Sequence, residues 1–162
     1  DFLMLGNYIR HNTGIGFRTF AGGLLFGVGT VFALGFNGLF LGSVAGHLTR
    51  EGYTETFWPF VVGHGAFELT AILISATAGL QLARALFAPG RRGRLGALRA
   101  TAPASITLVV GAALLFLLAA FIEAFWSSRG DVPAEGKYAV AAALWLLVIG
   151  FFSLSGRARR GS

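Results

Sequence analysis

Four long apolar stretches constrain this chain more than any other feature, and they cover residues 20–46, 57–87, 104–126 and 138–155. A helix needs about 20 mostly apolar residues to cross a bilayer, and the stretches approach or exceed that length. Only 12% of the residues are charged, about half the share in an average soluble chain. We therefore predict an all-α fold: a polytopic transmembrane helical bundle of about four spans, with residues 1–162 as a single membrane domain.

The charged residues between these stretches are distributed unevenly. If the stretches are helices, successive connecting segments lie on alternate sides of the membrane. One side then carries most of the basic residues, namely Arg10, Arg18, Arg84, Arg91, Arg92, Arg94, Arg99, Arg157, Arg159 and Arg160. The other side carries Arg50, Arg129 and Lys137 together with Glu51, Glu55, Asp131 and Glu135. The positive-inside rule predicts that both ends of the chain are cytoplasmic and that the two short loops lie outside.

This distribution also explains the net charge of +6. A cationic inner face attracts anionic lipid head groups, so membrane lipids are the expected partner and nucleic acid is not. The chain has no cysteine, which excludes a disulfide framework and a thiolate metal site.

Two further segments complete the predicted organisation. Residues 1–19 have amphipathic character, and we expect them to form an interfacial segment. The arginine-rich residues 88–103, flanked by Pro89 and Pro103, are expected to form a cytoplasmic loop. Because the chain begins with Asp1 and not with methionine, we also expect an N-terminal portion to be missing.

The first stretch is rich in glycine at four-residue spacing. Gly23 and Gly27 form one GxxxG motif, and Gly38, Gly42 and Gly46 form two more in series. Small residues at this spacing let helix backbones approach closely. Two uses remain open for them: packing within the chain, or a homo-oligomer face.

The length of this stretch raises a second question. Residues 20–46 would rise about 40 Å as one helix, more than the roughly 30 Å hydrocarbon core requires. The stretch is either one tilted helix or two half-helices. We favour a break or kink at Asn37-Gly38, where Asn37 would cap the second half or line a cavity.

Three ionisable side chains lie within the predicted spans: His64, Glu68 and Glu123. A charge in hydrocarbon costs about 2.5–3.5 kcal/mol on insertion scales, so these side chains should face the bundle interior. His64 and Glu68 are four residues apart and share a helix face. Counted from Trp58 and Trp126, they lie about 9, 15 and 5 Å from one boundary. We therefore expect an intramembrane polar cluster of His64, Glu68 and Glu123, with Asn37 as a fourth polar group.

Several roles are open for this cluster. It could be a structural clasp, a proton or solute pathway, or a weak candidate metal site, since imidazole and carboxylates are normal metal ligands. The HGAFE sequence is not the HExxH zinc pattern, and no nucleophile–base pair stands out, so neither an enzyme nor a cofactor is expected. Glu123 lies near a helix C-terminus, where the dipole disfavours an anion. The negative charge of Glu123 could be compensated by Arg50, Arg129 or a protonated His64, or it could be removed by protonation of Glu123 itself.

Three ordered motifs resemble the stage II sporulation protein M family. They are Asn37-Gly38-Leu39-Phe40-Leu41-Gly42, His64-Gly65-Ala66-Phe67-Glu68-Leu69 and Ala119-Ala120-Phe121-Ile122-Glu123-Ala124. One departure is Gly63, where the family pattern has proline. The resemblance implies a multi-pass bacterial inner-membrane protein, with a further N-terminal span in many members. In spore formers it implies a complex with two peptidoglycan-degrading proteins.

The predicted function follows from this resemblance and from the short outer loops. We expect an integral membrane scaffold or complex subunit in bacterial cell-envelope (peptidoglycan) remodelling. Its expected partners are other envelope membrane proteins, among them peptidoglycan-degrading enzymes, and further copies of itself. The alternative is a small oligomeric transporter or channel that uses the His/Glu cluster.

Overall fold

The computed structural model describes residues 2–155, and within this range it contains helices and no strand. The long helices are α1 (Phe2–Ala21), α2 (Val28–Arg50), α3 (Thr54–Phe87), α4 (Gly93–Ile122) and α5 (Ala134–Ser155). Two 3₁₀ turns, η1 (Gly22–Leu24) and η2 (Gly90–Arg92), and a π-helical turn, η3 (Glu123–Ser127), complete the described chain. Four helical segments are long and apolar enough to cross a membrane: α2, α3, the run from η2 through η3, and α5. The predicted all-α membrane bundle is confirmed.

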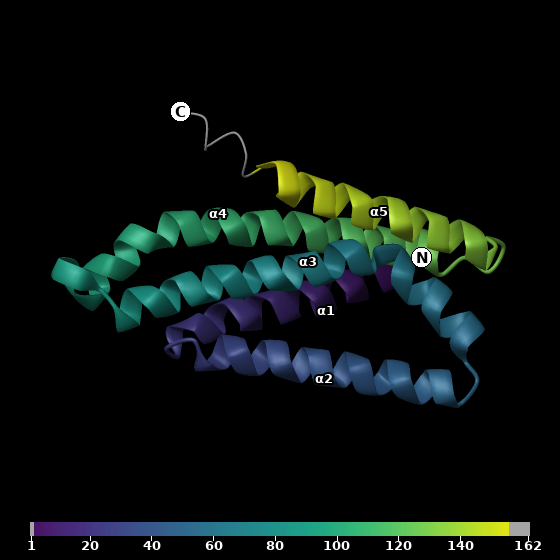
Figure 1. The fold of residues 1–162 in the computed structure, drawn as a ribbon, viewed down its shortest axis with the longest axis horizontal. Helices are drawn as coiled ribbons and strands as arrows, with labels where there is room; N and C mark the ends of the chain where they lie inside the picture. Colours follow the sequence, from purple (N-terminus) through teal and green to yellow (C-terminus); the bar gives the residue numbers. More distant parts are fainter. Residues whose placement is uncertain (1, 156–162) are drawn as a thin grey trace.

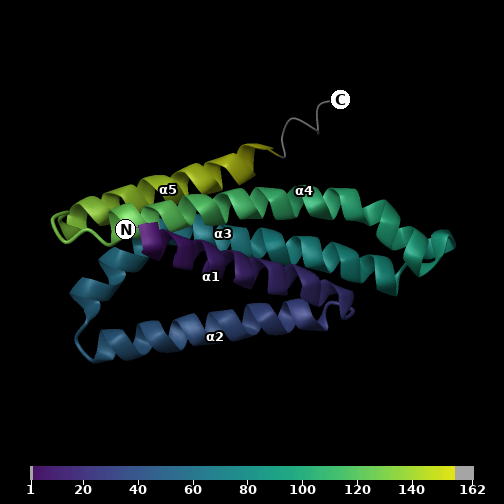
Figure 2. The same ribbon diagram turned by 180° about the vertical axis from the view of Figure 1, so that it is seen from behind.

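The helices run side by side around a central pair formed by α3 and α4 (Figure 1). Helix α1 packs on both α3 and α4, while α5 packs on α3 and α2 contacts α1 and α3. In both views, α2 and α5 occupy opposite edges of the bundle (Figure 2). The edge helices are therefore the ones with the most surface free for lipid or for another protein.

The two ends of the bundle differ in charge. The end we call the acidic end carries the α2–α3 and α4–α5 turns, with Glu51, Glu55, Asp131 and Glu135. The end we call the basic end carries the α1–α2 and α3–α4 turns, with Arg18, Arg84, Arg91, Arg92 and Arg94. The predicted basic residues Arg157, Arg159 and Arg160 lie outside the described residues.

Helix α1 corrects the expected arrangement of residues 1–19. These residues form a helix that lies along α3 and α4, with Asn12, Gly16 and Thr19 buried. The start of α1 lies at the acidic end, and α5 runs back toward the basic end (Figure 1). The first and last described helices therefore point toward opposite ends, unlike the expectation that both chain ends share one side. The cause is the additional helix α1, which the hydropathy pattern alone does not reveal.

The predicted break at Asn37-Gly38 is wrong. Helix α2 continues through both residues, and the Asn37 side-chain nitrogen donates a hydrogen bond to the Ala33 carbonyl oxygen of the same helix, at 2.7 Å. The chain reverses earlier, at residues 22–27, where Phe26 and Gly27 have φ angles of 53° and 82°. The excess length of the first apolar stretch is therefore used in a tight turn between α1 and α2.

The expected loop at residues 88–103 is also shorter than predicted. Helix α3 ends at Phe87 and α4 begins at Gly93, so most of the arginine-rich segment is helical. Pro103 lies inside α4, where it removes one backbone hydrogen bond. A second internal proline, Pro59, lies near the start of α3, whose first turns are set at an angle to the rest of the helix (Figure 1). Proline is a common cause of such kinks.

Small residues and one aromatic ring form the core. Ala71 and Ile72 of α3 pack with Ala112 and Phe116 of α4, and Phe116 is only 1% exposed. Gly16 of α1 faces the same ring, because a Cβ at Gly16 would collide with Phe116. Most large apolar side chains of α2 and α5 point outward instead, as expected where lipid is the solvent.

Candidate functional site

A polar cluster lies inside the bundle, where α1, α3 and η3 meet. It consists of Asn12, His64, Glu68, Glu123 and Ser127, and we call it the polar cluster. Four of these residues are buried, and the Glu68 side chain is 22% exposed. The structure thus brings together the three predicted ionisable residues, two from α3 and one from the π-helical turn η3.

His64 is the centre of the polar cluster. Its Nδ1 lies 3.1 Å from the Ser127 hydroxyl oxygen. Its Nε2 lies 3.5 Å from a Glu68 carboxylate oxygen and 4.0 Å from a Glu123 carboxylate oxygen. A histidine with its proton on Nε2 accepts from the Ser127 hydroxyl and directs its N–H toward both carboxylates. The imidazole therefore links α3 to η3.

Local backbone geometry brings these groups close. Glu123 and Ser127 are the first and last residues of the π-helical turn η3, and both face His64. Turns of this kind occur often at functional sites. Gly63 allows the close approach, because a Cβ there would lie 2.8 Å from the Ser127 hydroxyl oxygen. The residue that departs from the family pattern therefore lies inside α3, directly against η3.

Asn12 provides the third connection of the polar cluster. It is 2% exposed, and its side-chain nitrogen lies 3.5 Å from the second Glu123 carboxylate oxygen. The sequence pattern did not place Asn12 in the cluster. The sequence does contain a pattern that indicates the burial of Asn12. Small and polar residues recur at helical spacing and form one buried face of α1, namely Asn12, Gly16 and Thr19.

The cations proposed to compensate Glu123 lie elsewhere. Arg50 pairs with Glu51, and Arg129 pairs with Asp131, both at the surface. The hydrogen bond from the Arg129 guanidinium lowers the pKa of Asp131 to about 2. Neither arginine is engaged with Glu123, whose neighbours are Asn12 and His64.

The remaining predicted site residues separate into two groups. Gly23 packs against the Gly79 backbone so closely that a Cβ would collide with it, and a Cβ at Gly27 would lie 3.0 Å from the Ala83 Cβ. In contrast, a Cβ added at Gly38, Gly42 or Gly46 would meet nothing within 4 Å in the described part of the chain. Asn37 bonds within its own helix and lies apart from the polar cluster.

The side chains of the polar cluster contact one another. Among residues 2–155, no group of three His, Cys, Asp or Glu side chains is arranged to hold a metal ion. The polar atoms instead pair with one another across three segments. Buried polar pairs of this kind stabilise one helix register, because a slipped register would leave them unsatisfied.

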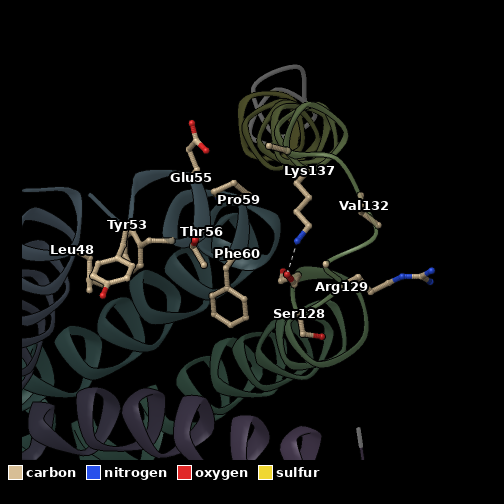
Figure 3. Close-up of a pocket in the computed structure, with 14 residues that line it drawn as sticks. Leu48, Tyr53, Glu55, Thr56, Pro59, Phe60, Ser128, Arg129, Val132 and Lys137 are labelled. Atoms are coloured by element: carbon tan, nitrogen blue, oxygen red, sulfur yellow. Dashed lines mark hydrogen bonds between the residues drawn. The ribbon is translucent and has the colours of Figure 1, made fainter. Parts of the chain in front are cut away.

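A pocket of about 510 Å³ opens at the acidic end beside the polar cluster (Figure 3). It lies between the end of α2, the first turns of α3 and the segment from η3 to the first turn of α5. Ser127 belongs to both the polar cluster and the pocket lining. Lys137 reaches across from α5, and its Nζ donates to the Ser127 carbonyl oxygen at 2.8 Å. The charge pattern predicts an outer-loop position for Lys137, whereas the residue is 7% exposed.

The comparison with known families agrees with this architecture. Residues 1–128 match the family described as stage II sporulation protein M. The match covers α1 to α4 and includes all five residues of the polar cluster. No curated protein and no solved structure is significantly similar to the chain. With most of its length matched and four helices that can cross a membrane, this chain is a multi-pass membrane protein of the stage II sporulation protein M family.

Proposed function

We propose that this protein is a membrane scaffold, a complex subunit in bacterial cell-envelope (peptidoglycan) remodelling. The observation that carries the proposal is the outer face of α2. Gly38, Gly42 and Gly46 recur there at four-residue spacing, and their open sides meet no other segment of the described chain. Three glycines in one helix interior cost stability, about 0.5–1 kcal/mol each relative to alanine. Close approach of another helix offsets that cost.

The occupant of this face is a transmembrane helix of a partner envelope protein. Residues 28–46 carry no charge, so the face offers shape and no ionic contact. Lipid chains gain nothing from a glycine groove, whereas a second helix backbone gains close packing. A further copy of this chain is the other outcome that the experiment below distinguishes.

The polar cluster has a supporting role in this proposal. It links α1 to α3 and η3 through Asn12, His64 and Glu123. Helices α1 and α3, against which α2 packs, therefore form one rigid frame. We place this frame in the cytoplasmic membrane with the basic end facing the cytoplasm, because arginines concentrate on that side in membrane proteins.

Affinity purification from intact cells in mild detergent tests the proposal. The wild-type protein should recover envelope membrane proteins, and Gly42→Leu should lose them without any loss of thermal stability. Phe40→Leu is the matched control, because position 40 is exposed on nearly the opposite face of the same helix. Equal recovery by the wild type and Gly42→Leu would contradict the proposal, and recovery of tagged copies of this chain alone would identify a homo-oligomer.

The transporter alternative has one observation in its favour. The pocket at the acidic end reaches Ser127, whose hydroxyl lies one hydrogen bond from His64. Glu68→Gln and Glu123→Gln separate the two functions. A pathway predicts that these variants lose flux in proteoliposomes while they unfold at the wild-type temperature. A clasp predicts lower stability or weaker assembly, with no flux in the wild type.

A further inference from the structure

Lys137 is a buried cation with incomplete pairing. It lies in the first turn of α5 and is 7% exposed, yet its ammonium makes one hydrogen bond, to the Ser127 carbonyl oxygen. Among the described residues, no carboxylate forms an ion pair with it. An ammonium has three donors, so two remain available. A buried charge without an ion-pair partner is costly, and an anion that enters the pocket would offset that cost.

The pocket around Lys137 has a polar side and a mainly apolar side, and Tyr53, Glu55 and Thr56 also line the latter. Ser127, Ser128 and Lys137 line the polar side. Leu48, Phe57 and Phe60 line the apolar side, and Phe60 points into the space between the helices (Figure 3). A volume of about 510 Å³ is in the range of small-molecule sites. A ligand that matches both sides has an anionic head and an apolar portion.

The other charged groups at the pocket do not satisfy Lys137. The Glu55 carboxylate and the Arg129 guanidinium both point away from it (Figure 3). Asp131 is close enough to interact electrostatically with Lys137, but its carboxylate is bonded to Arg129 and forms no ion pair with the lysine, and Glu135 of the same helix turn is exposed. The pocket also adjoins the start of α5, where unpaired backbone N–H groups favour an anion.

We propose that this pocket binds the phosphate of an anionic phospholipid, with Lys137 on the phosphate and the acyl chain along Leu48, Phe57 and Phe60. A lipid is the favoured source of the phosphate because of the apolar side. Two lining residues, Phe57 and Pro59, flank Trp58 in the first turns of α3, and aromatic residues gather at the level of the membrane where head groups lie. The site includes Leu48 of α2 but none of Gly38, Gly42 and Gly46, so it is separate from the glycine face and goes beyond the scaffold function.

The test compares three probes on the purified full chain in detergent: dihexanoyl phosphatidylglycerol, dihexanoyl phosphatidylcholine and inorganic phosphate. The wild type should bind phosphatidylglycerol at least about 10-fold more tightly than the other two probes. Lys137→Gln should remove most of this preference, because the amide can still donate to Ser127 but carries no charge. Arg50→Gln is the control, because Arg50 is an exposed arginine at the same end of the bundle that does not line the pocket, and it should bind within about 2-fold of the wild type.

A second variant keeps the test decisive if Lys137→Gln does not fold. Thr56→Phe places a ring in the pocket from the α3 side without touching the Lys137–Ser127 bond, and it should weaken phosphatidylglycerol binding to a similar degree. Equal affinity of the wild type for both lipids would overturn the proposal, as would unchanged binding by Lys137→Gln or Thr56→Phe. Inorganic phosphate bound as tightly as phosphatidylglycerol would overturn the lipid assignment.

Discussion

Two groups of glycines with the same spacing have different surroundings in this protein. Gly23 and Gly27 lie at the α1–α2 turn and pack against Gly79 and Ala83, which are themselves four residues apart on α3. Gly38, Gly42 and Gly46 lie further along the same apolar stretch and face open space. The GxxxG spacing therefore indicates close packing without identifying the partner. The first group is used inside the chain, and the second is available to another helix.

The largest expected effect distinguishes these groups directly. Gly23→Val would push a side chain into the Gly79 backbone and should lower the free energy of unfolding by about 3 kcal/mol. Gly38→Val adds the same side chain in open space and should change it by less than about 0.5 kcal/mol. Thermal unfolding of both variants in detergent measures the difference. Similar losses would mean that the two groups have similar surroundings after all.

A second prediction tests whether the polar cluster holds α1 in place. Asn12→Ala leaves Glu123 without its amide neighbour and should cost about 1–3 kcal/mol. Asn7→Ala is the matched control, because Asn7 lies on the exposed face of the same helix. The two midpoints of thermal unfolding give the comparison. Equal midpoints would show that the polar cluster does not fasten α1.

Alanine substitutions should change the free energy of unfolding by a smaller amount, with opposite signs in the two groups of glycines. Gly42→Ala should raise the free energy of unfolding by about 0.5–1 kcal/mol, because it removes the entropic cost of glycine in a helix. Gly27→Ala should lower it, because Gly27 has a φ of 82° that alanine adopts only with strain. Unfolding of the isolated chain is the measurement. A loss of stability in Gly42→Ala would place position 42 in a packed interface within the chain.

Asn37 should contribute little to stability, although it lies between the two glycine groups. Its side chain bonds to a carbonyl of its own helix, so Asn37→Ala should change the free energy of unfolding by less than about 0.5 kcal/mol. The unfolding midpoint in detergent measures this change. A large loss would restore the predicted capping or cavity role of Asn37.

The smallest effect concerns the surface pair of Arg129 and Asp131 at the acidic end. Because the pKa of Asp131 is lowered to about 2 in the folded state, its stabilisation is present above the usual carboxyl range and is lost as pH falls toward 2. Asp131→Asn should therefore differ slightly from the wild type between pH 7 and pH 4, and the difference should vanish near pH 2. Unfolding midpoints across this range measure it. A difference that persists at pH 2 would assign another role to Asp131.

The sequence predicts some of these features better than others, for physical reasons. The four apolar spans are predictable because lipid demands long uncharged helices. The meeting of His64, Glu68 and Glu123 follows from the cost of exposing charge to lipid. The packing of α1 against α3 and α4 is not predictable in this way, because its polar face and short apolar pattern are typical of an interfacial segment. The turn at residues 22–27 was missed because glycines there fit equally well a continuous helix with packing motifs.

Helical continuity at Asn37 illustrates the same ambiguity. An asparagine followed by glycine favours a break, but the Asn37 side chain satisfies a carbonyl of the preceding helical turn instead. The burial of Lys137 depends on how α5 returns against η3, and no local pattern in the sequence reports that contact. Long-range packing decides both outcomes.

Photo-crosslinking in native membranes tests the central claim most directly, namely that the open glycine face of α2 receives a partner transmembrane helix. A photo-reactive residue would replace Gly42 in one variant and Phe40, which is exposed on nearly the opposite face, in another. We predict a discrete cross-linked protein product from position 42 and none from position 40. No protein product from position 42, or equal products from both positions, would contradict the account.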